Sequence, residues 1–300
     1  MAGVSYGECA EDWNADQAIA KYTQQLQTEP NNAVLYNNRG MAYKRKNDIN
    51  QALADLTRAI ELNPNYADAY NNRGTIYYSR GNYENALNDY NKAIQFDSNN
   101  AVAYNNRGLT HGSIGSEAKR RGQTAKRDNE FNQAISDYTN AIRLNPKYAE
   151  AYQNRGATYS WMDKFNEAID DLTKALEYGE KNEQIYVSRG FSYFMIDDAN
   201  RAIADYTNAL QIKPNYGTAY NNRGTVYLNK GEYDRAIEDF TKALELDDTY
   251  APDAYNNRGV AYYHKGQYDL AIDDFTRALS IKPNFQDAID NLKAVYAAKG

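Results

Sequence analysis

Few residues in this 300-residue sequence are suited to catalysis. The most reactive side chains are one cysteine and two histidines, namely Cys9, His111 and His264. Cys9 lies close to Glu8 and Glu11, and neighbouring carboxylates disfavour the reactive thiolate. Adjacent acids such as Asp170 and Asp171 point about 100° apart on a helix and do not chelate one ion together. No phosphate loop, zinc spacing or EF-hand loop is present. The sequence therefore predicts no catalytic residue, no metal site, no cofactor and no enzymatic activity.

Asparagine amides are better placed for binding than for catalysis. A carboxamide offers one acceptor and two donors, so it can pair with both the C=O and the N–H of an extended peptide. Six asparagines stand two residues before a recurring glycine, and Ser188 takes this place once: Asn38, Asn72, Asn106, Asn154, Asn222 and Asn257. This Asn row is a candidate peptide-binding site. The alternative is that these amides bond the neighbouring helix or simply follow a repeat consensus.

Arginine and aspartate recur with the same glycine. The arginine directly precedes the glycine, and the aspartate follows later in the same unit. The predicted pairs are Arg39–Asp55, Arg73–Asp89, Arg107–Asp137, Arg155–Asp171, Arg189–Asp205, Arg223–Asp239 and Arg258–Asp274. Where half a unit is missing at each end of the chain, Lys21 and Leu292 stand in the corresponding places. We expect bidentate pairs with a structural, orienting role.

These residues are positioned by a repeat of 34 residues. Successive arginines are 34, 34, 48, 34, 34 and 35 residues apart, so one unit carries an insertion of 14 residues. A tyrosine four before and another three after most of the glycines share one face of a first helix. Alanines seven residues apart, such as Ala52 and Ala59, mark one face of a second helix, with a Leu, Tyr or Phe between them. Each unit therefore reads as a helix, a turn and a helix.

A 34-residue helical hairpin with these Gly, Ala, aromatic and Pro positions resembles the tetratricopeptide repeat (TPR) family. One departure is constant, because the family usually has an apolar residue where this chain has arginine before the glycine. The resemblance implies an all-α, right-handed solenoid that forms one domain over residues 1–300. We expect a half repeat or cap at residues 1–31, seven repeats at 32–283 with the insertion at about 116–129, and a capping helix at 284–300.

The resemblance also implies that the first helices line a concave face, which would include the Asn row. One stretch of that face is apolar where other repeats are polar. Its residues are Trp161, Val187, Phe191, Phe194 and Met195. Apolar surface with aromatic anchors is typical of interaction sites. The alternatives are that these side chains pack between imperfect repeats, or that Asp163 and Asp197, which replace glycine, change the local turn.

Residues 116–129 carry five basic side chains against Glu117 and Asp128. The insertion either extends the two helices of its repeat or projects as a loop. Contact with an anion, an acidic partner or RNA is conceivable for it, but a solvated extension is the favoured interpretation. The family's carboxylate clamp for acidic chaperone tails is not supported, because only its asparagines have counterparts here.

Composition sets the remaining expectations. The formal charge of −6 disfavours binding of nucleic acid or anionic membrane. No apolar run approaches membrane-spanning length. With no secretory signal visible and one cysteine, a cytoplasmic location is expected, or a periplasmic one if a signal has been removed. The leading hypothesis is a monomeric or weakly self-associating scaffold for a protein or peptide partner. The alternatives are a structural protein that self-associates through its ends or the apolar stretch, and a regulatory arm severed from an enzyme.

Overall fold

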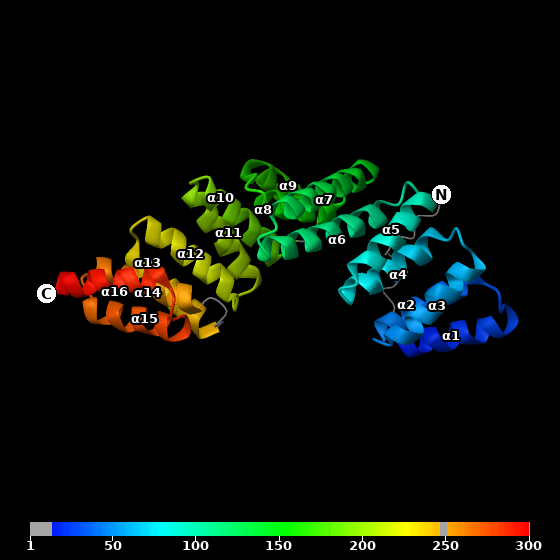
Figure 1. The fold of residues 1–300 in the computed structure, drawn as a ribbon, viewed down its shortest axis with the longest axis horizontal. Coiled ribbons are helices and arrows are strands. Elements are labelled where there is room, and N and C mark those ends of the chain that lie inside the picture. Colours follow the sequence, from blue (N-terminus) through cyan, green and yellow to red (C-terminus); the bar gives the residue numbers. More distant parts are fainter. Residues whose placement is uncertain (1–13, 180, 247–250, 300) are drawn as a thin grey trace. The chain divides into compact units, whose positions relative to one another are not determined.

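The computed structural model describes residues 14–179, 181–246 and 251–299, and within these ranges it contains helices and no strands. The chain divides into two compact units, and the boundary between them follows Ala151, within one helix. Figure 1 shows helices paired with their chain neighbours throughout both units. This all-α architecture confirms the fold class expected from the sequence. The predicted half repeat at residues 1–31 lies partly outside the described residues.

The first unit, which ends at Ala151, contains one helix before its helical hairpins. Its helices are α1 (Ala15–Thr28), α2 (Ala33–Arg45), α3 (Ile49–Leu62), α4 (Ala67–Ser79), α5 (Tyr83–Phe96), α6 (Ala101–Arg120) and α7 (Thr124–Leu144), followed by the start of α8 (Ala149–Trp161). The hairpins are α2–α3, α4–α5 and α6–α7.

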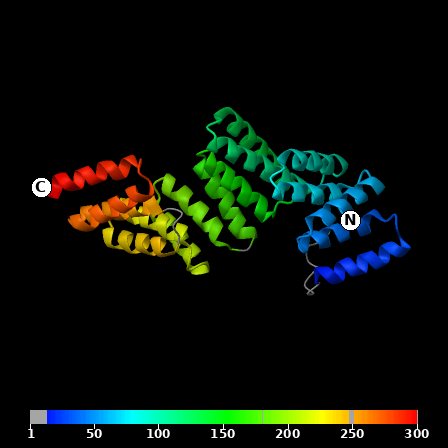
Figure 2. The same ribbon diagram turned by 60° about the horizontal axis from the view of Figure 1, so that its bottom comes forward.

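The second unit begins at Tyr152, within α8, and ends with a helix that has no partner after it. Its further helices are α9 (Phe165–Tyr178), α10 (Glu183–Met195), α11 (Ala199–Ile212), α12 (Gly217–Asn229), α13 (Tyr233–Leu246), α14 (Ala251–His264), α15 (Tyr268–Ile281) and α16 (Gln286–Lys299). The last helix packs against α14 and α15, as Figure 2 also shows at the C-terminal end.

Short polar side chains start many of these helices. Asn32 accepts hydrogen bonds from the backbone N–H groups of Val34 and Leu35, and Asp48 and Asp198 cap α3 and α11 in the same way. Such caps satisfy backbone donors that have no partner inside the helix. The predicted tyrosine-rich first helices and alanine-rich second helices therefore begin where the sequence provides a cap or a turn.

The turns inside the hairpins share one backbone conformation. Gly81, Gly231 and Gly266 have φ between 71° and 75° at the turn, and Asp163 and Asp197 have φ of 60° and 64° at the equivalent places. Aspartate tolerates this left-handed region better than most residues, although glycine is favoured. Replacing glycine by aspartate therefore does not change the turn, contrary to one alternative considered from the sequence.

The recurring glycine lets the two helices of a hairpin approach closely. A Cβ atom on Gly74 would lie 2.8 Å from Cε1 of Tyr90, and one on Gly259 would lie 2.7 Å from Cε1 of Phe275. Alanines such as Ala86 and Ala93 on the second helices are completely buried. Small residues on both helices therefore leave space for one large side chain between them, which is the packing expected from the sequence.

Within each unit, consecutive first helices contact one another. In the first unit α2 contacts α4 and α4 contacts α6; in the second, α10 contacts α12, α12 contacts α14 and α14 contacts α16. No corresponding contact joins the second helices of neighbouring hairpins within either unit's described residues. The first helices are therefore closer together and form the inner row of each unit. We call this surface the inner face.

The 14-residue insertion lengthens both helices of its hairpin. Helices α6 and α7 have 20 and 21 residues, whereas the other helices have 13 or 14. The extension is packed, because Phe131 is buried against Gly115, where a Cβ atom would lie 2.6 Å from the ring. Of the two possibilities left open by the sequence, the structure shows helical extension, with a tight turn at Arg121–Gln123.

Candidate functional site

Each predicted arginine forms a bidentate pair with the predicted aspartate of its own hairpin. In every pair Nε and Nη2 of the arginine donate to the two carboxylate oxygens at 2.6–2.9 Å. The aspartates are buried on the second helix, and the arginines are largely covered. The planar guanidinium matches a carboxylate in this parallel geometry, so each pair fixes the register of its hairpin.

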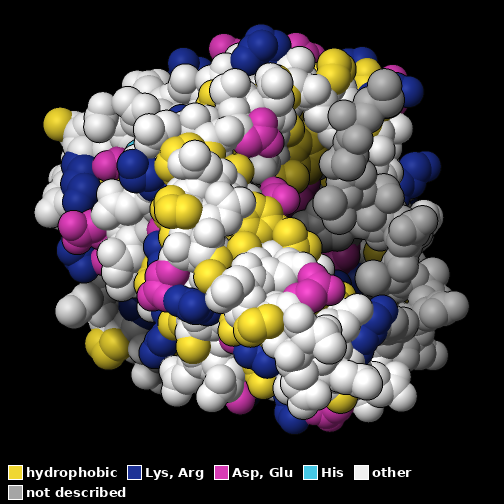
Figure 3. All heavy atoms as spheres, turned by 90° about the vertical axis from the view of Figure 1, so that its right-hand side faces the viewer, with side chains coloured by type: hydrophobic (Ala, Val, Ile, Leu, Met, Phe, Trp, Pro, Cys, Tyr) yellow, Lys and Arg dark blue, Asp and Glu magenta, His cyan; other side chains and the backbone are white. Residues whose placement is uncertain are grey.

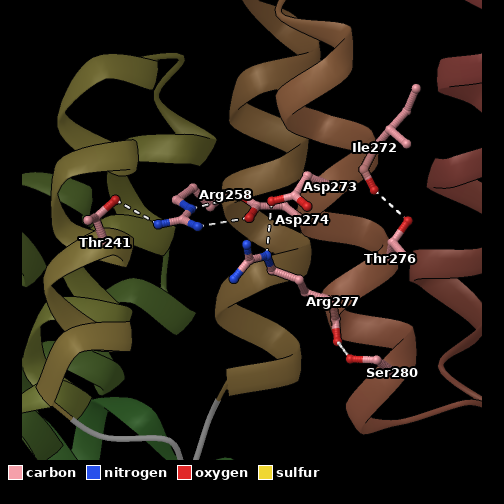
Figure 4. A network of polar contacts seen from close by, with 8 residues as sticks. All are labelled: Thr241, Arg258, Ile272, Asp273, Asp274, Thr276, Arg277 and Ser280. Atoms are coloured by element: carbon pink, nitrogen blue, oxygen red, sulfur yellow. Dashed lines mark hydrogen bonds and ion pairs between the residues drawn. The ribbon is translucent and has the colours of Figure 1, made fainter.

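The same arginine reaches a third helix. Figure 4 shows Arg258 on α14 between Asp274 on α15 and Thr241 on α13, the second helix of the preceding hairpin. Equivalent donations from Nη1 join the arginines to Thr23, Thr57, Asn91, Thr173 and Thr207. Sequence reasoning missed this link, although the Thr or Asn recurs two residues after the aspartate. The arginine therefore connects neighbouring hairpins as well as the two helices of its own hairpin.

Tyrosines flank the guanidinium on its own helix. In α12 the Arg223 guanidinium carbon lies 5.6 Å from the Tyr220 ring centroid and 5.9 Å from that of Tyr227. The pattern recurs around Arg39, Arg73, Arg155, Arg189 and Arg258. A cation near an aromatic face is stabilised by the ring quadrupole. The 29 tyrosines of the chain are therefore partly explained by reuse of this arrangement.

The Asn row lies on the first helices, and two of its six amides are seen to bond the neighbouring first helix. Nδ2 of Asn72 donates to Oδ1 of Asn37 at 2.9 Å, and Nδ2 of Asn106 donates to Oδ1 of Asn71 at 3.0 Å. In the second unit Asn291 donates to Asn256 in the same way. The acceptors form a second, buried asparagine column. This is the inter-helix role that the sequence left open as the alternative to peptide contact.

These bonds do not use all of the polar groups of the Asn row. Asn72 and Asn106 are only partly buried, and the bond that each donates to the preceding first helix uses one of the two N–H groups of the amide. One N–H and the oxygen of Asn72, and those of Asn106, remain available for another partner. Asn72 and Asn106 therefore join first helices of the first unit and still have donors and acceptors to offer a partner.

One member of the second asparagine column differs from the others. Oδ1 of Asn221 is buried and has no hydrogen-bond partner within the described residues. The corresponding oxygens of Asn37, Asn71 and Asn256 each accept from the next first helix. A buried acceptor without a partner costs about 1–3 kcal/mol. This atom is therefore a local weak point in the inner row of the second unit.

The predicted apolar stretch is only partly exposed, and the prediction of exposure is wrong for Val187. Val187 is 6% exposed and packs in a core cluster with Tyr186 and Tyr206, while Phe194 is half-buried against that cluster. Val187 occupies the position of the second, buried asparagine column, which explains why it turns inward. Trp161, Phe191 and Met195 are exposed, as predicted. The exposed surface is therefore smaller than the sequence suggested.

The structure adds one residue to this surface. Ile196 follows Met195 in the turn after α10 and is 40% exposed. The Phe191 ring meets Phe165, at the start of α9, edge to face with 6.2 Å between centroids. We define the apolar turn patch as Trp161, Phe191, Met195 and Ile196, all in the second unit. Ile196 stands where most other hairpin turns have a basic residue, and this exchange is visible in the sequence.

Charged side chains form no patch of a single sign on the face that Figure 3 draws. In Figure 3 basic and acidic side chains are interspersed over the visible face. At the tip of the α6–α7 extension Arg121 pairs with Glu117, and Arg127 pairs with Asp128. Lys119, Arg120 and Lys126 are exposed there. The local pairs reduce the effective charge of this tip, which is consistent with a solvated extension.

The histidines lie in structural settings. Nδ1 of His111 lies 2.7 Å from a carboxylate oxygen of Glu130, between α6 and α7. The ring of His264 stacks on the ring of Tyr233, with 5.0 Å between centroids.

Among the residues that the structure describes, no group of three or more His, Cys, Asp or Glu side chains is placed to hold a metal ion. None of the described helices has the length and apolar character needed to cross a membrane.

Stacked helical hairpins with a repeated three-helix arginine link define a helical-repeat protein. Comparison with known families agrees. Tetratricopeptide-repeat models match residues 33–66, 149–182, 218–250 and 252–285, and residues 56–88; a further TPR-repeat model matches 74–115, 126–160 and 198–231. The chain belongs to the tetratricopeptide repeat family.

Solved structures of other proteins share this fold. YrrB, described as a TPR protein with an unusual peptide-binding site, is 25% identical, with a TM-score of 0.56 over 68% of this chain and 97% of its own. A TPR protein from Parabacteroides merdae is 21% identical, with a TM-score of 0.56 over 93% of this chain and 99% of its own. In the Cut9–Hcn1 assembly of the APC/C, the matched chain is 22% identical with a TM-score of 0.63, covering 94% of this chain and 54% of that one. A search of curated proteins gave no match.

Proposed function

We propose that this protein is a non-catalytic interaction scaffold that holds an extended peptide or a partner helix against its inner face. TPR repeats and the similarity to TPR proteins support an interaction scaffold in general. The observation that carries the finer proposal is the residual hydrogen-bonding capacity of the Asn row. Asn72 and Asn106 are fixed by bonds between first helices, so they present donors and acceptors without losing much side-chain entropy on binding.

Two different kinds of surface support this proposal. In the first unit, the inner face carries amides and hydroxyls, such as Asn72, Thr75 and Asn106. The second unit carries the apolar turn patch at the C-terminal parts of α8 and α10. Amides suit main-chain contacts, which tolerate many sequences, whereas exposed aromatic and aliphatic side chains supply anchoring. The similarity to YrrB, which has a peptide-binding site, is consistent with the same general activity here.

The experiment that tests the proposal starts from peptides selected by phage display of random 12-residue sequences on the immobilised full chain. Calorimetry then compares their affinity for the original chain and for the Asn72→Ser/Asn106→Ser variant. Serine is a matched replacement because Ser188 holds this position in α10. Loss of two hydrogen bonds of about 1 kcal/mol each predicts roughly tenfold or greater weakening.

The control for this experiment is Asn85→Ala, on the exposed side of a second helix. It should leave the affinity unchanged. Thermal unfolding of each variant separates loss of the bonds between first helices from loss of peptide contact. Failure to select any peptide, or equal affinity of the Asn72→Ser/Asn106→Ser variant, would refute binding through the Asn row.

Self-association through the C-terminal end is less favoured by the structure. Lys293 on α16 stands where the repeats have their close-packing glycine, and its side chain is exposed. A second helix added there could not approach as α15 approaches Gly259. Light scattering after size exclusion tests the alternative, because a mass of about 34 kDa at all concentrations excludes assembly.

A further inference from the structure

The apolar turn patch concentrates unusual exposure in two consecutive hairpins. Trp161 is 52% exposed, Phe191 40%, Met195 46% and Ile196 40%, and they account for four of the nine large hydrophobic residues that are exposed within the described parts of the chain. Trp161 and Met195 occupy equivalent positions 34 residues apart, at the ends of α8 and α10. The repeats elsewhere have polar residues there: Arg45, Ser79, Asn229 and His264. Among the short hairpins of the described chain, a large apolar side chain at this repeat position is therefore found in these two.

The next residue in each turn departs from the repeat in the same way. The usual residue is basic, at Lys46, Arg80, Lys230 and Lys265. Lys46 pairs with Asp16 of the preceding second helix, and Lys265 pairs with Asp234 in the same manner. Met162 and Ile196 replace these basic residues in the two patch turns. The two patch turns therefore lack the basic side chain that can pair with the preceding second helix, as Lys46 and Lys265 do.

The turn residue that follows is also exchanged. It is Asn47, Gly81, Gly231 or Gly266 in the other short turns, but Asp163 and Asp197 in the patch turns. Both aspartates are exposed, and neither forms an ion pair or a side-chain hydrogen bond with any other described residue. Two neighbouring turns have thus replaced a basic and a neutral residue by an apolar and an acidic one.

The cations closest in sequence are engaged with other groups. Lys164 lies 6.0 Å from the centroid of the Tyr159 ring. Arg201 pairs with Asp198 and lies 5.0 Å from the centroid of the Tyr193 ring. Asp163 and Asp197 are therefore not neutralised from within their own turns. Their backbone conformation is one that glycine adopts at lower cost, so stability alone does not favour aspartate there.

We infer that the apolar turn patch binds a partner segment in which large apolar side chains stand next to lysine or arginine. The inference rests on the proposed scaffold function and names the partner class for the second unit. Trp161, Phe191, Met195 and Ile196 would cover the apolar side chains of that segment, and Asp163 and Asp197 would pair with its cations. An acidic segment would place like charges together, which is unfavourable.

Defined peptides test this inference. The probe is a 14-residue fluorescein-labelled peptide of Leu, Phe and Lys. A second peptide has Glu in place of every Lys, and a third has Ser in place of every Leu and Phe. Fluorescence anisotropy at about 50 mM salt should show binding of the first peptide and at least tenfold weaker binding of the other two. Equal binding of the Lys and Glu peptides would overturn the charge preference.

Variants locate the binding site. Asp163→Asn/Asp197→Asn keeps the turn, because Asn47 has a φ of 64° at the same place. Removal of two exposed charge contacts should weaken binding of the Lys peptide roughly three- to tenfold. Glu84→Gln/Glu238→Gln removes two other exposed charges and should have no effect. Equal weakening by both double variants would show a general charge effect and refute the inferred site.

Tryptophan emission supplies an independent readout. Trp13→Phe leaves Trp161 as the sole tryptophan, so its emission should shift to the blue when the Lys peptide covers it. If phage-selected peptides bind through the Asn row while the Lys peptide neither binds nor shifts Trp161, this inference fails and the proposed scaffold function stands. If no peptide binds anywhere on the chain, both fail together.

Discussion

Arg258 and Asp274 are joined by two parallel hydrogen bonds of 2.8 Å, from Nε to Oδ2 and from Nη2 to Oδ1. The same guanidinium donates to Thr241 at 2.9 Å and lies near Tyr255 and Tyr262. Burial raises the pKa of the Asp274 carboxyl, and the bonds from Arg258 oppose this rise. The pair therefore retains a buried carboxylate only as long as the arginine is present.

Replacing Arg258 by leucine should destabilise the protein strongly, because Asp274 would remain buried without its partner. We expect a loss of about 3–5 kcal/mol in the free energy of unfolding, measured by urea denaturation. The Arg258→Leu/Asp274→Leu variant should recover a large part of this loss, because no uncompensated charge remains. Equal destabilisation by the single and double variants would contradict this account of the pair.

The surface pair of Arg277 and Asp273 provides a matched control for the Arg258 substitution. Arg277 pairs with Asp273 on the surface of α15, one turn from the buried pair (Figure 4). Both side chains are more than half exposed, so solvent screens their interaction. Arg277→Leu should leave the unfolding midpoint almost unchanged. A large effect at this surface pair would show that the repeat responds to any loss of charge.

The fold was predictable from the sequence because identical positions recur every 34 residues. The Gly, Ala and aromatic positions specify a helical hairpin, and one arginine with one aspartate in each unit was enough to anticipate the ion pairs. The third partner, such as Thr241, was missed although it recurs equally well. Its role depends on the stacking of neighbouring hairpins, which periodicity within one hairpin does not reveal.

The candidate binding surfaces were harder to predict. Val187 looked exposed because it interrupts a polar motif, yet its position on α10 faces the core. The bonds from Asn72 to Asn37 depend on the distance between first helices, which the sequence does not determine. Exposure and partner choice both follow from packing between hairpins, whereas the repeat pattern mainly reports packing within them.

Glycine substitutions in α6 should separate close packing from helix propensity. A Cβ atom at Gly115 would lie 2.6 Å from the Phe131 ring, whereas one at Gly112 would meet only the Tyr138 hydroxyl at 3.5 Å. Gly115→Ala should therefore destabilise by about 1–3 kcal/mol through overpacking. Gly112→Ala should be neutral or stabilise by up to about 1 kcal/mol, because alanine favours the helix. Thermal unfolding of both variants checks the contrast, and a common direction of change would contradict it.

Asn221 offers a test of the unpaired acceptor in the second unit. Valine occupies the corresponding place in α10, so Asn221→Val is compatible with the hairpin. Removing a buried oxygen that lacks a partner should raise the free energy of unfolding by up to about 1–2 kcal/mol. The same change at Asn71 should lower it, because Nδ2 of Asn106 would lose its acceptor. Chemical denaturation of both variants should thus give opposite signs, and equal signs would count against the assigned bonding.

The buried tyrosines should make the fold sensitive to alkaline pH. Burial raises the pKa of the Tyr90 and Tyr206 phenols above the ordinary value of 10.0. The folded protein therefore keeps these protons at a pH at which the unfolded chain releases them, so stability falls as the pH rises above about 10.

Phe240 and Phe275 fill the same position in other hairpins, which makes Tyr90→Phe/Tyr206→Phe a conservative replacement. This variant should resemble the original chain at pH 7 and lose less stability between pH 9 and pH 11, as measured by urea denaturation. Tyr296→Phe, at an exposed position, is the control and should follow the original pH profile. Identical alkaline profiles for the original chain and the double variant would show that these phenols do not control the transition.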